Sequence, residues 1–110
     1  MIYEIERTHQ FDLWLKNLKD RQAVLAVTKR LTRIALGNFG DSKPVGDDVC
    51  ELRFFIGPGY RVYYTIQNKK IIFLLNGGDK STQLRDIKKA KQIAKKLKEQ
   101  NQYENKNSPI

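Results

Sequence analysis

Few of the residues on which common enzyme sites depend occur in this sequence of 110 residues. Cys50 is its one cysteine and His9 is its one histidine. A single cysteine excludes an intramolecular disulfide, and one cysteine with one histidine is too few for a usual zinc site. The serine-hydrolase motif GxSxG, the dinucleotide fingerprint and the phosphate loop GxxxxGKS/T are also absent. We therefore expect no metal ion and no cofactor.

Long apolar runs are lacking as well. No stretch approaches the 18 apolar residues that a membrane-spanning helix needs. The first ten residues, MIYEIERTHQ, alternate apolar and charged side chains and do not form the apolar region of a signal peptide. These absences, together with the single cysteine, predict a soluble protein of the cytoplasm.

Positive charge is what the sequence has in excess. Lysine and arginine number 21 against 12 acidic residues, which gives a net charge of +9 and an isoelectric point of about 9.8. Residues 81–110 carry eight of the basic residues and only three acidic ones. This excess suits a polyanionic partner such as nucleic acid, a membrane surface or an acidic protein segment.

The first half of the chain predicts a strand followed by a helical hairpin. Residues 1–7 alternate like a strand with one wet face. Thr8 is placed to cap a helix, and two helical patterns follow, separated by a short break at residues 19–21. Gly37 stands where the second helix should end, and residues 37–48, rich in glycine, predict a loop.

The second half predicts three strands and a last helix. The strands are expected at residues 49–56, 60–67 and 71–76, and the run IIFLL predicts that the last of them is central and covered on both faces. An amphipathic helix with a lysine-rich outer face follows. The order β-α-α-β-β-β-α predicts an α+β domain at residues 1–99 with a mainly antiparallel sheet, and residues 100–110 predict a flexible tail.

Strand alternation suggests where a functional site would lie. Along residues 60–67, Val62 and Tyr64 share the core face, so Arg61 and Tyr63 are expected to face solvent together. Arg53 of the preceding strand should lie on the same wet face, and the segment GGDKST should bring Lys80 towards it. Such a cluster predicts a platform for phosphates and bases.

Each of these features also has an ordinary structural explanation. An arginine on a wet strand face is commonly solvated or paired across strands, and a tyrosine is a common strand residue. The sequence GPG is explained by turn geometry alone, and lysines on a terminal helix usually form a solvated face.

Three segments met in this order carry a family resemblance: GNFGDSKPVG, ELRFFIGPGYRVYY and LLNGGDKSTQ. With them, residues 1–98 resemble the addiction-module killer proteins, the HigB-like branch of the RelE/ParE toxin superfamily. The resemblance implies a RelE-like fold, with a twisted sheet flanked by an N-terminal helical hairpin and a C-terminal helix. It also implies a toxin that is encoded beside an antitoxin with a helix-turn-helix domain.

The activity implied by the RelE-type resemblance is ribosome-dependent, metal-independent cleavage of mRNA, which stops translation. The ribose 2'-hydroxyl attacks the phosphate and leaves a cyclic phosphate. Partners implied are the antitoxin, the ribosome and mRNA, without a membrane. Relatives of the ParE type instead poison DNA gyrase, and a plain nucleic-acid-binding module would also explain the charge. Both remain alternatives.

Matching motif by motif, the resemblance implies the catalytic residues Arg61, Arg53 and Lys80, and the expected position of Tyr63 beside Arg61 adds it as a fourth. The arginines would stabilise charge on the phosphate, Lys80 would protonate the leaving 5'-oxygen or neutralise charge, and Tyr63 would stack on a base or orient the 2'-hydroxyl. The residues expected to bind RNA are Lys43, Phe55, Lys88, Lys91 and Lys95. Where RelE-type enzymes often carry two lysines this strand reads CELRFF, and their late tyrosine or histidine has no counterpart, so the general acid and base stay unassigned.

Overall fold

The computed structural model describes residues 2–107, with side chains described for residues 2–100. The order of helices and strands along the chain largely follows the prediction. In chain order they are β1 (Glu4–Arg7), α1 (His9–Asn17), α2 (Arg21–Ala35), β2 (Ser42–Gly46), β3 (Val49–Arg53), β4 (Arg61–Gln67), β5 (Ile71–Gly78), the short 3-10 helix η1 (Lys80–Thr82) and α3 (Gln83–Asn107). Within residues 2–107, no helix combines the length and apolar character that crossing a membrane requires.

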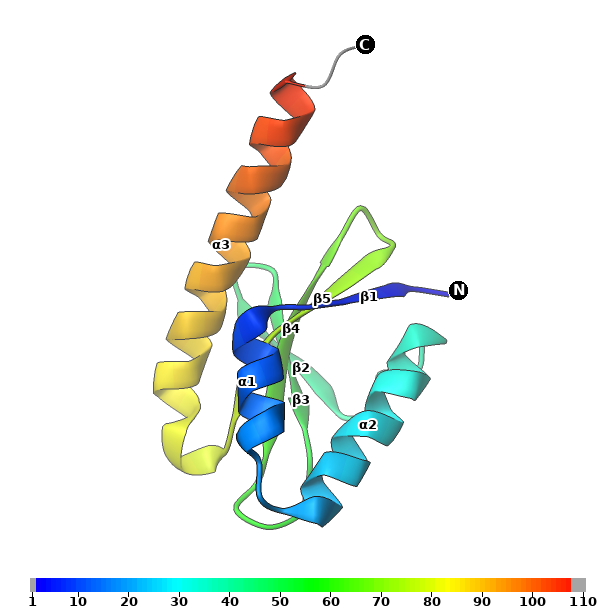
Figure 1. The fold of residues 1–110 in the computed structure, drawn as a ribbon, viewed down its shortest axis with the longest axis vertical. Coiled ribbons are helices and arrows are strands. Elements are labelled where there is room, and N and C mark those ends of the chain that lie inside the picture. Colours follow the sequence, from blue (N-terminus) through cyan, green and yellow to red (C-terminus); the bar gives the residue numbers. More distant parts are fainter. Residues whose placement is uncertain (1, 108–110) are drawn as a thin grey trace.

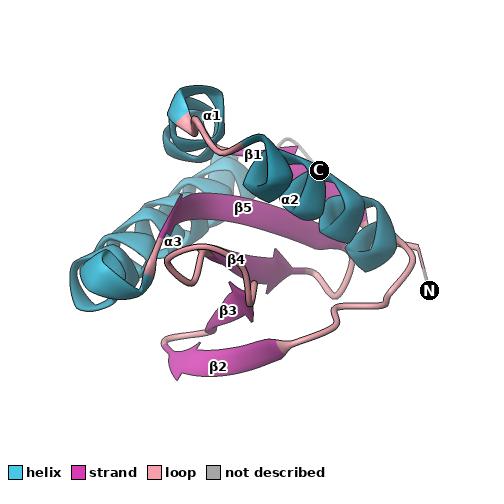
Figure 2. Ribbon diagram, turned by 90° about the horizontal axis from the view of Figure 1, so that it is seen from below, coloured by secondary structure: helices cyan, strands magenta, loops and turns pink. Residues whose placement is uncertain are grey.

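The five strands form one mixed sheet in the order β1-β5-β4-β3-β2 (Figures 1 and 2). β1 pairs with β5 in parallel, and every other pair is antiparallel. The α+β class and the mainly antiparallel sheet are therefore confirmed. β5 is covered on both faces as expected, but β4 takes the middle position.

The predicted element boundaries need three corrections. Residues 42–46, expected to be loop, form the edge strand β2, because their pairing with β3 satisfies the backbone even around Pro44. β3 ends at Arg53 and not at residue 56, and the helix α3 continues to Asn107, through most of the segment expected to be a tail. The domain boundary at residue 99 stays a prediction.

The helical hairpin begins and ends at the predicted residues. Thr8 caps α1 by accepting a hydrogen bond from the amide of Phe11 at 3.1 Å, and Asp20 caps α2 in the same way through Ala23. Gly37 follows α2 with a φ of 90°, the left-handed conformation that closes a helix. These caps set the lengths of α1 and α2 so that both lie along one face of the sheet.

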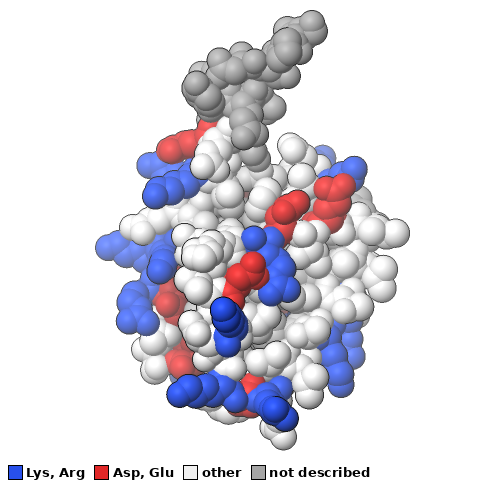
Figure 3. Space-filling model, in the orientation of Figure 1, with Lys and Arg blue, Asp and Glu red and all other residues white. Residues whose placement is uncertain are grey.

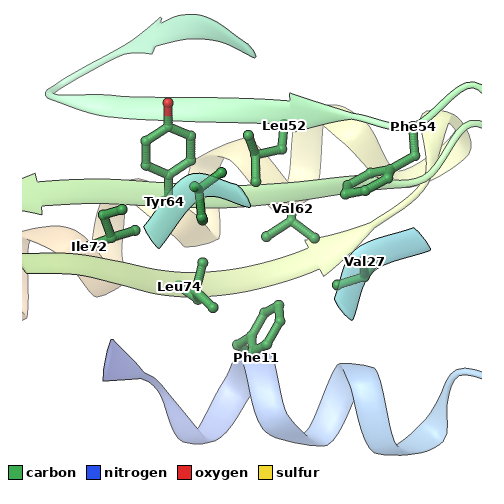
Figure 4. Packing of buried hydrophobic residues seen from close by; sticks show 9 residues of the cluster. Phe11, Val27, Leu52, Phe54, Val62, Tyr64, Ile72 and Leu74 are labelled. Atoms are coloured by element: carbon green, nitrogen blue, oxygen red, sulfur yellow. The ribbon is translucent and has the colours of Figure 1, made fainter. Parts of the chain in front are cut away.

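The larger core lies between the helical hairpin and that face. Phe11 of α1 and Val27 of α2 pack against residues of the strands, and against Phe54 just after β3, that are at most 5% exposed (Figure 4): Leu52, Phe54, Val62, Tyr64, Ile72 and Leu74. The strand residues alternate along β3 and β4, as the period of a strand requires. Burial and a nearby cysteine thiol raise the pKa of Tyr64 to about 12.

A second core lies under α3 on the opposite face. Ala90 and Ala94 of α3 pack on Tyr63, Val49 and Leu75. The small alanine side chains leave room for the large tyrosine, which is 0% exposed. The prediction that Tyr63 faces solvent is therefore wrong, because alternation assigns its face correctly but does not show that a later helix covers it.

Two adjacent glycines let the helices of both layers approach the same strand. A side chain at Gly77 would overlap the ring of Trp14 in α1, and one at Gly78 would overlap the carboxylate of Asp86 in α3. The segment GGDKST therefore leads β5 out between the two layers of helices and turns directly into η1. This tight turn fixes where Lys80 lies.

Candidate phosphodiester site

Arg53 and Arg61 are direct neighbours across the β3–β4 pair. Residues opposite each other in an antiparallel pair project to the same face, with Cβ atoms about 5 Å apart. The expectation that these two arginines share a face is therefore met, although the face is not fully exposed. The side chain of Arg53 is 35% exposed and that of Arg61 is 13% exposed.

Lys80 lies beside Arg61 because both pack against Gly59. A Cβ atom at Gly59 would meet Nη1 of Arg61 at 3.2 Å and Cβ of Lys80 at 3.6 Å. The amide of Lys80 donates to the carbonyl of Pro58 at 3.4 Å, which ties the turn after β5 to the loop before β4. Arg53, Arg61 and Lys80, called the arginine cluster below, thus come from β3, β4 and the 3-10 helix η1.

Arg61 is held by a buried carboxylate that the sequence did not single out. Its Nε lies 3.4 Å from Oε1 of Glu51, and its Nη1 donates to the carbonyl of Gly59 at 2.6 Å. Glu51 is 1% exposed, and its other oxygen accepts a hydrogen bond from the amide of Gln83 at 2.9 Å. A buried carboxylate fixed on both oxygens restricts the guanidinium to one orientation.

Tyr63 lies under this ion pair and not at the surface. Its hydroxyl is buried without an aligned hydrogen-bond partner. Burial raises the pKa of the phenol far above its usual value, and the negative charge of Glu51 adds to the increase. The phenol therefore stays protonated at every physiological pH.

Arg53 is fixed by a second carboxylate. Its guanidinium donates to Oδ1 of Asp41 at 3.0 Å from Nη2, and its backbone amide donates to the Asp41 carbonyl at 3.0 Å. Arg30 of α2 stabilises the end of β3. Its guanidinium donates to the carbonyl of Arg53 at 3.0 Å and lies 4.4 Å from the centre of the Phe54 ring. Burial lowers the pKa of Arg30.

The site is close to charge balance. Arg53 is paired with Asp41 and Arg61 with Glu51, and the carboxylate of Asp79 also lies near Arg61. Hydrogen bonds from Ser81 lower the pKa of Asp79, and the nearby charge of Arg61 contributes to the shift. The arginine cluster is therefore rigid and oriented, but it does not form the open patch of positive charge that the sequence predicts.

The residues expected to bind RNA fall into two groups. Lys43 and Phe55 lie near the arginine cluster: Lys43 is exposed opposite Glu51, and Phe55 is 82% exposed with the guanidinium of Arg53 5.8 Å from its ring centre. Lys88, Lys91 and Lys95 lie on α3, along a groove at the other end of β4. Figure 3 shows basic side chains along the edge where α3 lies and at the end where it begins.

Residues that matter for this geometry were missed by sequence reasoning, chiefly Glu51, Asp41 and Arg30. Glu51 alone gave a signal, because in ELR it shares a strand face with Arg53. Among the residues that the structure describes, no three histidine, cysteine, aspartate or glutamate side chains gather into a group suited to a metal ion.

Comparison with solved structures identifies the fold as that of RelE toxins. A mutant of the E. coli toxin RelE in the free state matches with a TM-score of 0.63 at 17% identity, over 78% of this chain and 93% of that one. The toxin–antitoxin complex RelBE2 from Mycobacterium tuberculosis matches with a TM-score of 0.59 at 18% identity, over 73% of this chain and 100% of that one. The intact E. coli RelBE toxin–antitoxin complex matches with a TM-score of 0.55 at 18% identity, over 70% of this chain and 95% of that one.

Sequence comparison then gives the family. Residues 13–99 match the model of the phage-derived Gp49-like proteins, so the chain belongs to that family, which is RelE-like. The resemblance to the RelE/ParE superfamily is thereby confirmed. An uncharacterised protein from Haemophilus influenzae is 48% identical over 97 residues, which are 88% of this chain and 98% of that protein.

Proposed function

We propose that this chain is the toxin of a type II toxin–antitoxin module and cleaves mRNA on the ribosome in the cytoplasm without a metal ion, which stops translation. The observation that carries the proposal is the direct pairing of Arg53 with Arg61, with Lys80 against the same glycine as Arg61. The Gp49-like family and the RelE fold support a toxin of this type. Two of the similar structures are toxin–antitoxin complexes, which supports a cognate antitoxin as partner.

In this mechanism the ribose 2'-oxygen attacks the adjacent phosphorus, and the bond from phosphorus to the 5'-oxygen breaks. The products are a 2',3'-cyclic phosphate and a 5'-hydroxyl, so one proton leaves the 2'-hydroxyl and one reaches the 5'-oxygen. Negative charge grows on the phosphate as the reaction passes through a pentacoordinate state. A fixed donor aimed at such charge contributes about 3 kcal/mol to a reaction barrier.

The side chains of the arginine cluster take different parts in this reaction. Arg61 and Arg53 bind the phosphate oxygens through the donors that their carboxylate partners leave available, since a guanidinium has five N–H groups. Lys80 is exposed beside Arg61 and donates a proton to the leaving 5'-oxygen. Tyr63, which is fully buried, supports Glu51 and Arg61 from beneath and does not stack on a base.

RNA binding is assigned to residues around and beyond this site. Phe55 is the most exposed aromatic ring near the arginines, and it offers a face on which a base can stack. Lys43 extends the positive charge along β2, while Lys88, Lys91 and Lys95 of α3 attract ribosomal RNA over a longer range. Because the arginine cluster is nearly neutral, these lysines supply most of the electrostatic attraction.

Mapping of mRNA ends tests the proposal. Cells expressing the chain should stop growing and accumulate mRNA fragments that end in a cyclic phosphate, and Arg61→Ala should abolish both effects. Purified protein should produce the same ends on translating ribosomes but not on free mRNA. Fragments that end in a 3'-hydroxyl would contradict attack by the 2'-oxygen. Growth arrest that survives Arg61→Ala and is accompanied by a DNA-damage response would indicate action on gyrase instead.

A further inference from the structure

A groove lies between α3 and the strand ends farthest from the arginine cluster. It encloses about 1040 Å³, at the upper end of the range for ligand pockets and enough for several side chains of a partner. β4 begins at Arg61 and ends at Gln67, which lines the groove, so at about 3.3 Å per residue the two sites are about 20 Å apart. The groove is therefore a separate surface.

The floor of the groove is apolar and its rims carry opposite charges. Ile71, Phe73 and Ala94 lie at the floor, because Phe73 and Ala94 pack in the core under α3 and Ile71 is two positions before Phe73 on β5. One rim is α3, with the lysines 88, 91, 95 and 98. The other rim is the turn between β2 and β3, with Asp47 and Asp48. Exposed apolar surface rimmed by charges is typical of an interaction site.

Most of the lysine rim has no acidic partner among the side chains of residues 2–100. Lys91 lies 3.8 Å from Asp47 across the groove. Among the side chains that the structure describes, no ion pair joins Lys88, Lys95 or Lys98 to a carboxylate. Three cations beside an apolar floor thus remain available to a ligand that carries both acidic and apolar groups.

We propose that this groove is the docking site of an acidic, amphipathic segment of a partner protein, which under the proposed function is the antitoxin. Apolar side chains of the segment lie on Ile71 and Phe73, and its carboxylates face the α3 lysines. RNA fits less well, because Asp47 and Asp48 on the opposite rim repel phosphates and Phe73 is the one aromatic residue among the described residues that line the groove. A polypeptide can match both rims, whereas a uniformly negative backbone matches only one.

The location gives a mode of neutralisation. A segment in this groove leaves Arg53, Arg61 and Lys80 uncovered, because it lies at the other end of β4. It does cover the α3 lysines to which long-range attraction of ribosomal RNA is assigned. The antitoxin therefore keeps the toxin from the ribosome and does not fill the site of cleavage.

Affinity for the antitoxin tests the inference. The probe is the purified protein encoded beside this chain whose co-expression restores growth, and the measurement is its Kd by titration calorimetry. Ile71→Glu and Lys95→Glu should each weaken binding at least 10-fold. The matched control Lys96→Glu makes the same charge change at an exposed position outside the groove and should change Kd less than 3-fold.

A second set of variants separates this inference from the proposed function. Arg53→Ala with Lys80→Ala should leave the Kd for the antitoxin within about 3-fold, and circular dichroism should confirm that every variant folds. Loss of binding in this double variant, or equal loss in Lys95→Glu and Lys96→Glu, would overturn the docking site while leaving the toxin activity in place. Groove-dependent binding by a chain that cleaves no mRNA would reject the nuclease and keep the docking site.

A measurement of RNA binding tests the other candidate for the groove, which is RNA. Single-stranded RNA of 12 nucleotides should bind with a Kd that Lys95→Glu and Lys96→Glu raise equally, because exposed lysines contribute to non-specific attraction regardless of the groove. Binding of RNA that depends on Ile71 and Lys95 but not on Lys96 would assign the groove to RNA instead.

Discussion

The two ends of β4 carry positive charge in opposite ways. At the arginine cluster, each guanidinium is paired with a carboxylate, and that of Arg61 also donates to the carbonyl of Gly59, so orientation is fixed and net charge is small. At the groove, Lys88, Lys95 and Lys98 of α3 have long, flexible side chains and no ion pair among the described residues. They lie beside an apolar floor. The first arrangement suits chemistry at one phosphate, and the second suits capture of a partner.

The largest effect is expected from Arg61→Ala. Loss of a fixed phosphate donor should lower the rate of mRNA cleavage at least 100-fold. The variant also leaves the carboxylate of Glu51 buried without its cation, which costs about 3 kcal/mol of stability. Single-turnover cleavage on ribosomes measures the first effect and urea unfolding the second.

The matched variant for this comparison is Arg61→Ala combined with Glu51→Gln. It removes the unpaired charge, so stability should return towards that of the wild type while cleavage stays lost. Recovery of cleavage in the double variant would show that Arg61 acts on the fold and not on the phosphate. Lys95→Glu, at the other end of β4, should raise KM a few-fold and leave kcat unchanged.

Glu51→Gln alone should have an intermediate effect. The amide keeps an acceptor for Gln83 but gives up the charge that orients Arg61, so kcat should fall about 10-fold. Glu51→Asp keeps the charge at a shorter reach and should recover part of the lost rate. Equal losses in both variants would mean that the size of the side chain matters and its charge does not. Thermal unfolding controls for misfolding.

Gly59→Ala should disturb the same end of β4 through the backbone. Gly59 has a φ of 77°, which disfavours a side chain, and the new Cβ would lie 3.2 Å from Nη1 of Arg61. Stability should fall by about 1 kcal/mol, and kcat should fall several-fold because Arg61 moves. Gly46→Ala, at another turn with positive φ far from the cluster, should lower stability without affecting kcat.

The last prediction concerns pH outside the physiological range and reports on the structure between the two ends of β4. Tyr63 and Tyr64 have pKa values above the usual 10, so their stabilising contribution is complete below pH 10 and is lost as pH rises through the folded-state pKa, about 12 for Tyr64. Each group should lower the unfolding free energy by about 1.4 kcal/mol per pH unit in that window. Tyr64→Phe should flatten the urea-unfolding profile between pH 10 and 12, and an unchanged slope would contradict the shift.

Much of the fold could be read from the sequence, because local patterns determine it. The caps at Thr8 and Gly37 and the apolar periodicity of the helices depend on neighbouring residues only. β2 was missed because a strand that contains Pro44 and Gly46 carries turn residues, and only pairing with β3 makes it a strand. Pairing is a property of the whole sheet.

The candidate site was predictable in its register but not in its environment. A strand period of two with a short loop already places Arg53 and Arg61 on one face. The cover over Tyr63 and the pairing of each arginine depend on where Gln83, Asp41 and α3 arrive in space. Whether the residues assigned to catalysis and RNA binding act as proposed stays a prediction.

The pairing of Arg53 with Arg61 also constrains how the loop between them can vary in length. Surface loops usually accept insertions and deletions, because the elements on either side keep their places. Here a change that shifted β3 against β4 by one position would turn one arginine to the opposite face of the sheet. The number of residues in the segment 54–60 therefore helps to determine whether the two arginines share a face. It matters for the cluster as much as the identity of the arginines themselves.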